Sequence, residues 1–112
     1  MTIFEKIAAR EIPAKIAHET DEFLAFHDVN PQAPVHVLIV PKHVIPRVAE
    51  ATDSDAAVLG RMLAATGEIA RKLGVADTGY RLVINNGRDA GETVPHLHMH
   101  LLAGRNLTWP PG

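Results

Sequence analysis

The chain has 112 residues, of which 46% are hydrophobic and 21% are charged, and its formal net charge is −2 at pH 7. This size and composition predict one globular domain, and the lack of a basic excess argues against a nucleic-acid polymer as partner. The absence of cysteine excludes disulfides and thiolate metal sites. The first residues lack the apolar core of a signal peptide, and no segment has the length of a membrane span, so we expect a cytoplasmic protein without membrane contact.

The first predicted element is a short helix, because Thr2 and Glu5 form a capping-box pattern and the helical stretch ends before Pro13. Two strands are predicted at residues 22–27 and 35–40, separated by turn-forming residues at 30–34. Apolar residues then recur at helical spacing over residues 53–73. The stripe that we expect to face the core consists of Leu59, Met62, Leu63, Thr66, Ile69, Ala70 and Leu73.

Two further strands are predicted at residues 80–85 and 96–102. Short connections between strands favour antiparallel pairing, and the long helix is expected to cover one face of the sheet. The predicted fold class is therefore α+β. We expect a single domain over residues 1–112, with a C-terminal tail from about residue 104 to residue 112.

The last predicted strand carries the main functional signal. Residues 95–103 read P-H-L-H-M-H-L-L-A, with a histidine at every second position. Successive side chains of a strand point to opposite faces, so His96, His98 and His100 would share one face, about 6.6 Å apart, while the apolar residues between them face the core. The pattern predicts three imidazoles presented to one site.

Three interpretations of this histidine face compete. In the first, the histidines have no functional role, which is ordinary for a single histidine on a strand but not for three in register. Zinc is a stronger alternative, because two histidines at this spacing can chelate and a third with a water would complete a tetrahedron. The triad contains no carboxylate, however, and we favour nucleophilic or acid–base chemistry, for which imidazole is suited near neutral pH. We expect neither a metal nor a cofactor.

The segment that leads into the triad is consistent with this chemistry. Residues 85–94 read N-N-G-R-D-A-G-E-T-V and follow an apolar run. Glycines and small polar residues let backbone amides approach an anion, although most such turns only connect strands. Beside three imidazoles, the loop is interpreted as a phosphate cradle.

Several segments together carry a family resemblance. These are H-L-H-M-H-L-L at 96–102, F-L-A-F-H-D-V at 23–29, P-Q-A-P-V-H at 31–36, G-Y-R-L-V-I-N-N-G at 79–87 and W-P-P-G at 109–112. The chain resembles the histidine triad (HIT) family over nearly its whole length. The W-P-P-G terminus favours the purine nucleoside phosphoramidase branch, the histidine triad nucleotide-binding proteins. The resemblance implies an antiparallel sheet of about five strands, with one long helix and a short N-terminal helix.

The resemblance also implies a reaction, the cleavage of the P–N bond of purine nucleoside 5′-phosphoramidates to AMP or GMP and an amine. His98 would attack phosphorus and form a nucleotidyl-histidine, while the carbonyl of His96 orients its ring. His100 and His36 would donate hydrogen bonds to the phosphate, with His36 in a relay with His96.

The resemblance places a hydroxyl near the leaving group, which in this chain is Thr93. Related proteins carry serine at this position, and they carry glutamine where this chain has Glu92. The extra methyl of threonine restricts rotation of the hydroxyl, so the handling of the leaving group is where this chain departs from the pattern.

The resemblance further assigns a nucleoside site. Asp28 would accept the ribose hydroxyls, although a turn role is an equal alternative from the sequence. The predicted walls of the base pocket are Ile7, Phe26, His27 and Val29, and the residues expected around the phosphate are Asn85, Gly91 and Val94. His18 and His43 are expected to be exposed and without a role.

The C-terminal tail carries the only tryptophan of the chain, Trp109. The resemblance implies a symmetric homodimer in which the tail of each protomer reaches the partner's site and shapes the choice of leaving group. Two alternative functions remain open. One is a dinucleoside polyphosphate hydrolase of the same superfamily, and the other is a non-catalytic nucleotide- or zinc-binding module.

Overall fold

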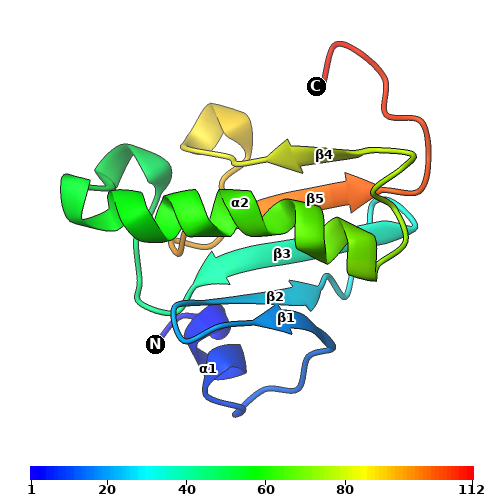
Figure 1. Ribbon diagram of the computed structural model, residues 1–112. Coiled ribbons are helices and arrows are strands. Elements are labelled where there is room, and N and C mark those ends of the chain that lie inside the picture. The colour runs from blue at the N-terminus through cyan, green and yellow to red at the C-terminus, as the bar shows by residue number, and fades with distance from the viewer.

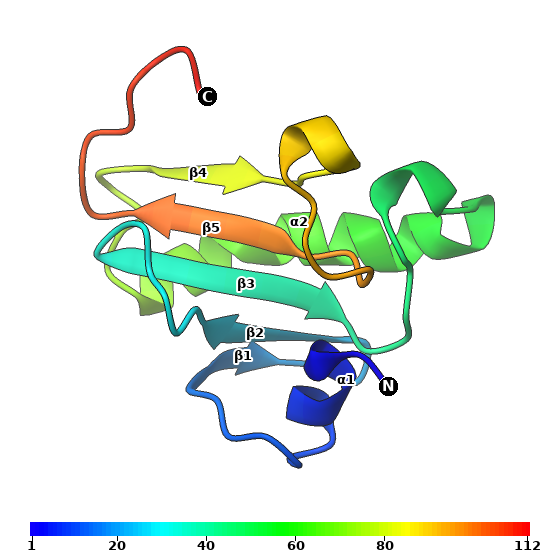
Figure 2. The same ribbon diagram turned by 180° about the vertical axis from the view of Figure 1, so that it is seen from behind.

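The computed structural model describes residues 1–112 and contains one five-stranded antiparallel sheet with the strand order β1-β2-β3-β5-β4. The long helix lies across one face of the sheet and the short N-terminal helix lies against the other face (Figures 1 and 2). The predicted α+β fold class is confirmed. The elements are α1 (Ile3–Ala8), β1 (Ile16–Glu19), β2 (Phe23–His27), β3 (Val35–Pro41), η1 (Val48–Glu50), η2 (Asp53–Asp55), α2 (Ala56–Lys72), β4 (Tyr80–Val83), η3 (Arg88–Ala90) and β5 (Met99–Ala103).

The central strands are buried on both faces, because alternate residues enter two separate hydrophobic clusters. On β3, Val37 and Ile39 belong to a cluster of 14 buried residues that includes the core residues of α2. Leu38 and Val40 belong to a second cluster of six buried residues that includes those of α1. The sheet is therefore the middle layer of three, with a large core under α2 and a small one under α1.

Helix α2 begins later than the sequence predicts, because residues 53–55 form a 3-10 turn that precedes it. Its buried stripe contains Met62, Thr66, Ile69 and Ala70, as expected. Leu63 was assigned to this stripe wrongly and is 56% exposed. One residue along a helix is a rotation of about 100°, which turns position 63 away from the sheet when position 62 faces it. No helix of the structure has both the length and the apolarity needed to cross a bilayer.

Strand β1 was not located from the sequence pattern. It has only four residues, both of its ends are exposed, and it pairs with β2 through an irregular register between Ile16 and His18. A short edge strand of this kind shows no clear alternation of apolar and polar residues. The other four strands lie where they were predicted, with boundaries shifted by at most three residues.

The largest boundary shift affects the histidines, because β5 begins at Met99 and not at residue 96. The pairing of β3 with β5 ends at Ile39 opposite Met99, so continued pairing would bring Pro41 opposite Leu97. Proline has no N–H to donate to the ladder. His96 and His98 therefore precede the strand, while the alternation of side chains continues and Leu97 enters the core.

Candidate active site

His96 is the anchored member of the triad. Its side chain is fully buried, and its Nε2 lies 2.7 Å from the carbonyl oxygen of Pro41. A carbonyl can only accept, so Nε2 carries the proton and Nδ1 accepts from the hydroxyl of Thr2 at 2.7 Å. Burial lowers the pKa of His96. This ring is therefore a neutral structural group held from both sides.

The hydroxyl of Thr2 also caps helix α1. It accepts the backbone N–H of Glu5 at 3.1 Å, and the Glu5 carboxylate accepts the backbone N–H of Thr2 at 2.8 Å. The predicted capping box is confirmed. Because the same hydroxyl donates to His96, the start of α1 is tied directly to the triad.

His98 is oriented by the backbone of its own segment. Its Nδ1 lies 2.8 Å from the carbonyl oxygen of His96, which fixes the proton on Nδ1. Its Nε2 makes no hydrogen bond within the chain. The ring is 8% exposed and packs edge-on against Phe4, with ring centroids 5.1 Å apart. The expected contact between His98 and the His96 carbonyl is confirmed.

A second pair of histidines lies beside His98. The backbone N–H of Gln32 donates to Nδ1 of His36 at 3.0 Å, so Nε2 of His36 carries the proton and donates to Nδ1 of His100 at 2.9 Å. The free Nε2 of His100 is therefore the protonated nitrogen of that ring. The rings of His98 and His100 are 5.1 Å apart. This chain of bonds ends at an N–H donor on the ring that neighbours His98.

The expected relay between His36 and His96 is wrong. In the antiparallel register His100 lies opposite Leu38 and His36 lies opposite Leu102, which makes His36 and His100 diagonal neighbours on one face. Both ring nitrogens of His96 are already bonded to other groups beyond the end of the strand pair. The partner of His36 is consequently His100. The expected donation from His36 to the phosphate is wrong as well, because the one N–H of this ring is used in the bond to His100.

The environment keeps the imidazoles of His36 and His100 neutral near pH 7. Burial lowers the pKa of His36, and the charge of Asp28 only partly opposes this effect. Burial, together with the neighbouring rings of His98 and His36, lowers the pKa of His100 to about 4. Neutral rings match the hydrogen-bond directions assigned above, since each neutral ring has one donor and one acceptor.

Asp28 combines a turn role with a position at the site. One carboxylate oxygen accepts the backbone N–H of Asn30 at 2.9 Å, which is the turn contact considered from the sequence. The other oxygen lies 3.5 Å from Nε2 of His36. Asp28, His36 and His100 offer possible metal ligands within 4.8 Å of one another. A cation there would have to replace the hydrogen bond between the two histidines, so the group is better suited to holding protons.

A mostly apolar cavity of about 230 Å³ lies between α1 and β2. All five residues expected near the nucleoside line it, namely Ile7, Phe26, His27, Asp28 and Val29. Val29 is 95% exposed, however, and lies at the rim. The remaining lining residues were not predicted, namely Ile3, Phe4, Ile12, Pro13, Ala14 and Leu38. The apolar face of α1 is the sequence signal that identifies two of them, Ile3 and Phe4. Phe4 links the cavity to the triad, because its ring also packs against His98.

The loop before the triad contains the other predicted residues. Asn85 and Val94 are half-buried, whereas Gly91 and Thr93 are exposed. Val94 packs against the small cluster under α1. Gly91 has φ 83°, a left-handed conformation that suits glycine.

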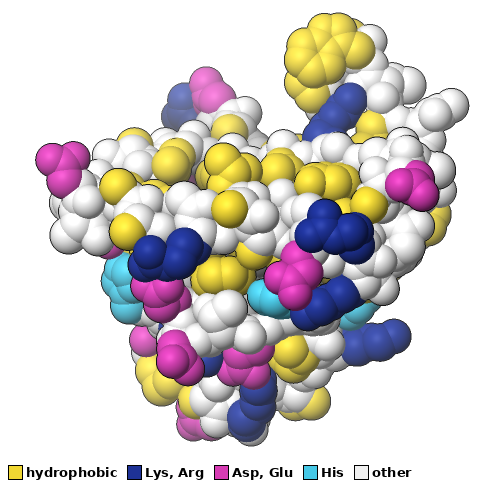
Figure 3. Space-filling model, in the orientation of Figure 1, with side chains coloured by type: hydrophobic (Ala, Val, Ile, Leu, Met, Phe, Trp, Pro, Cys, Tyr) yellow, Lys and Arg dark blue, Asp and Glu magenta, His cyan; other side chains and the backbone are white.

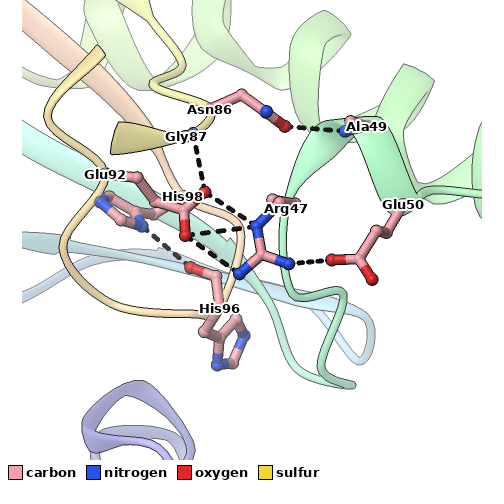
Figure 4. A network of polar contacts seen from close by, with 8 residues as sticks. All are labelled: Arg47, Ala49, Glu50, Asn86, Gly87, Glu92, His96 and His98. Carbon is pink, nitrogen blue, oxygen red and sulfur yellow. Dashed lines mark hydrogen bonds and ion pairs between the residues drawn. The ribbon is translucent and has the colours of Figure 1, made fainter. Parts of the chain in front are cut away.

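An ion pair that was not predicted holds this loop. The Nε and Nη2 atoms of Arg47 donate to the carboxylate of Glu92 at 3.0 and 3.1 Å, and the backbone N–H of Gly87 donates to the same carboxylate at 3.0 Å (Figure 4). Arg47 is 45 residues away in the sequence. No local pattern identifies such a pairing.

Trp109 lies apart from the histidines within the chain. Its side chain is 81% exposed on the tail that follows β5, near the β4 edge of the sheet (Figure 1). The guanidinium of Arg81 lies 6.0 Å from the Trp109 ring centroid. Arg81 also donates to the carbonyl of Leu107 at 3.2 Å, which holds the start of the tail.

Comparison with known proteins agrees with this arrangement. The HIT domain family model matches residues 9–107. An uncharacterized HIT-like protein of Synechocystis is 57% identical over 111 residues, which cover 99% of this chain and 96% of that protein. A HIT family hydrolase from Legionella pneumophila superposes with a TM-score of 0.96 at 44% identity, with both chains fully covered.

A more distant structure extends the comparison. The histidine triad nucleotide-binding protein from Candida albicans has a TM-score of 0.81 and 32% identity, covering 98% of this chain and 83% of that chain. The matched domain contains the whole sheet, the long helix and all the histidines described above. The chain belongs to the HIT domain family.

Proposed function

We propose that this protein is a purine nucleoside phosphoramidase that cleaves nucleoside 5′-phosphoramidates to a nucleoside monophosphate and an amine. The observation that carries the proposal is the state of His98. Its Nδ1 donates to the His96 carbonyl, its Nε2 makes no hydrogen bond, and the ring of His100, which carries a free N–H, lies 5.1 Å away between centroids. The names of the related structures, a hydrolase and a nucleotide-binding protein, support the same reaction class.

In the first step, the lone pair of His98 Nε2 attacks phosphorus and the P–N bond to the amine breaks. The bonding pair leaves with the amine nitrogen, which takes a proton from solvent water so that a neutral amine departs. The hydroxyl of Thr93 is proposed to hydrogen-bond to this nitrogen. The N–H group of His100 stabilises the charge that develops on the phosphoryl oxygens, and His36 holds the ring of His100 through their hydrogen bond.

In the second step, water attacks phosphorus and the bond between phosphorus and His98 breaks. The water loses one proton to solvent or product, and His98 returns to its neutral form with the nitrogen lone pair restored. The carbonyl of His96 holds the ring through both steps, because the proton on Nδ1 stays in place while the ring carries positive charge.

The apolar cavity is the proposed nucleoside site. The side chains of Ile7, Phe26, His27 and Val29 would contact the base, and the Asp28 carboxylate would accept the ribose hydroxyls. Asn85, Gly91 and Val94 are proposed to surround the phosphate. This assignment places the base on the α1 side of His98, where Phe4 joins the cavity to the triad.

The exposed tail is the proposed contribution of a second copy. We propose that residues 1–112 form one HIT domain whose tail, residues 104–112, reaches the active site of a symmetry-related protomer. Trp109 is largely exposed, and a large apolar ring is stabilised by a surface that covers it. In such a homodimer Trp109 would contact the leaving group.

The decisive experiment compares two substrates in excess EDTA, an adenosine 5′-phosphoramidate of an alkylamine and a diadenosine polyphosphate. We expect rapid release of the amine and AMP, slow cleavage of the polyphosphate, and no effect of the chelator. Faster cleavage of the polyphosphate would assign the protein to the dinucleoside polyphosphate hydrolases. Nucleotide binding without turnover of either substrate would indicate a binding module.

A further inference from the structure

A partly buried carboxylate helps to fasten the loop between β4 and β5 to the rest of the molecule. The side chain of Glu92 is 14% exposed and accepts two N–H groups of Arg47 as well as the backbone N–H of Gly87. The backbone N–H of Glu92 in turn donates to the carbonyl of Gly87 at 3.1 Å. Glu92 therefore closes the turn on itself and joins it to Arg47.

Arg47 is well placed to act as the fixed end of this link. It precedes the 3-10 turn η1, and its Nη1 forms a further ion pair with Glu50 of that turn. A second contact joins the same two segments, because the backbone N–H of Ala49 donates to Asn86 Oδ1 at 2.9 Å. Figure 4 shows these contacts side by side. The turn at 47–50 and the loop at 86–92 are thus held at two points.

The geometry of the Arg47–Glu92 ion pair is suited to positioning the loop more than to stabilising the fold. Arg47 offers Nε and Nη2 to one carboxylate, and such a forked contact fixes direction as well as distance. The hydrogen bonds from Arg47 and from Gly87 lower the pKa of Glu92, so the carboxylate is charged at neutral pH. Arg47 compensates this charge, which would otherwise repel an anionic phosphate near His98.

Glu92 is also adjacent to the residue proposed to assist the leaving group. Thr93 is exposed and makes no side-chain hydrogen bond, so nothing in its own contacts fixes its hydroxyl. Its position is set by the neighbours that are held, namely Glu92 on one side and half-buried Val94 on the other. Release of Glu92 would free the backbone that carries Thr93.

We propose that the Arg47–Glu92 ion pair is a positioning element that holds Thr93 against the leaving nitrogen, and that it thereby determines which leaving groups this enzyme expels. This inference rests on the proposed phosphoramidase function. A leaving group that needs a proton depends on the placement of Thr93. A leaving group that departs as a stable anion does not depend on it.

The test measures kcat/KM for two AMP derivatives, an alkylamine phosphoramidate and the 4-nitrophenyl ester, whose phenolate leaves without a proton. We expect Arg47→Met to lower kcat/KM for the phosphoramidate by about tenfold or more, and for the ester by a much smaller factor. Glu92→Ala removes the pair from its other end and is expected to show the same selectivity. Glu92→Gln keeps an oxygen for Arg47 and Gly87, and we expect it to restore most of the phosphoramidate activity.

The matched control is Arg61→Met, which breaks a forked ion pair with Glu22 at 2.6 and 2.7 Å on another part of the surface. Charged side chains of both signs lie next to one another on the α2 face, so pairs of this kind are not special to the site (Figure 3). We expect the control to leave the ratio of the two substrates unchanged. Thermal unfolding of each variant checks that it is folded at the assay temperature.

Equal losses for the two substrates in Arg47→Met and Glu92→Ala, or no loss in either, would overturn the positioning role. A shifted substrate ratio in Arg61→Met would do the same, since the effect would then be general. If the unaltered protein turns over neither substrate, the proposed function fails and this role fails with it. If the unaltered protein turns over the phosphoramidate but the variants show no selective loss, only the positioning role fails and the proposed function stands.

Discussion

The two faces of the sheet use the same strands but bury different groups. The α2 face buries a cluster of 14 hydrophobic residues and no histidine. The α1 face buries six hydrophobic residues next to three histidines with 8% exposure or less, His36, His96 and His98. Burying apolar surface is favourable on either face, whereas a buried imidazole must find hydrogen-bond partners.

The comparison shows how the α1 face, hereafter the polar face, is stabilised, in contrast to the apolar α2 face. No buried side-chain nitrogen or oxygen in the structure lacks a partner. The partners come from backbone groups of Pro41, Gln32 and His96 and from the hydroxyl of Thr2. Because backbone donors and acceptors cannot change identity, they fix each tautomer. The α2 face supplies stability, and the α1 face holds protons at defined atoms.

The largest expected effect lies on the polar face, at His98. We expect His98→Ala to reduce turnover by at least about a thousandfold, about 4 kcal/mol of barrier, while nucleotide binding is largely kept. The nucleotidyl adduct should be trapped on His98 in the parent protein and be absent in the variant. Activity within about tenfold of the parent would rule out the covalent mechanism.

The apolar face should show the opposite behaviour. Ile69 of α2 is fully buried in the large cluster, and Ile69→Ala is expected to lower the free energy of unfolding by about 2–5 kcal/mol. The rate per folded molecule should stay within about twofold. Phe4→Leu on the other face is the counterpart, because it keeps apolar volume but removes the ring that packs on His96 and His98. An activity loss in Ile69→Ala larger than in Phe4→Leu would contradict the division between the faces.

Asp28 tests whether the polar face extends to the ribose. We expect Asp28→Ala to weaken binding of AMP by about 1–3 kcal/mol, and to weaken binding of 2′-deoxy or 3′-deoxy analogues much less, since a hydrogen bond to a charged group is lost only with ribose. Calorimetric titration measures both. Equal losses for AMP and for its deoxy analogues would leave Asp28 with the turn contact to Asn30 alone.

Acid should weaken the polar face first. The pKa values of His36, His96 and His100 lie below the ordinary 6.5 in the folded protein, and that of His100 is about 4. The unfolded chain therefore binds more protons below pH 6.5, and stability is lost as the pH falls from about 6.5 towards 4. Above 6.5 these groups contribute in full.

Thermal unfolding between pH 7.5 and 4 measures this loss. We expect His100→Gln to reduce the slope between pH 6.5 and 5. The carboxyl groups with lowered pKa values act below their ordinary 4.5 and do not affect this range. A flat melting temperature from pH 7 to 5 would contradict the assignment of neutral buried histidines.

The sequence predicted the parts of the molecule that depend on local pattern. The alternation of residues 95–103 predicted which side chains enter the core, and the capping box predicted the start of α1. Strand β1 was missed because an edge strand of four residues has no periodic pattern. The start of β5 was misplaced because it depends on Pro41 of another strand.

The partners within the site were beyond the reach of local pattern. Which ring His36 contacts depends on the register between β3 and β5, and the His36–His100 bond joins residues 64 positions apart. The Arg47–Glu92 pair spans 45 positions and the Thr2–His96 bond spans 94. Contacts of this kind follow from the packed fold, and a single sequence carries no signature of them.

The smallest expected effect concerns the hydrogen bond between Thr2 at the start of α1 and His96 of the triad. Thr2→Val removes the hydroxyl that both caps α1 and donates to His96, and we expect a loss of about 1 kcal/mol in the free energy of unfolding. Thr52→Val is the matched control, because Thr52 forms a capping box with Asp55 away from the triad. Both variants lose a cap, but only Thr2→Val leaves Nδ1 of His96 without its donor. We therefore expect kcat to fall severalfold in Thr2→Val alone, and equal kcat values in the two variants would show that the triad is held without α1.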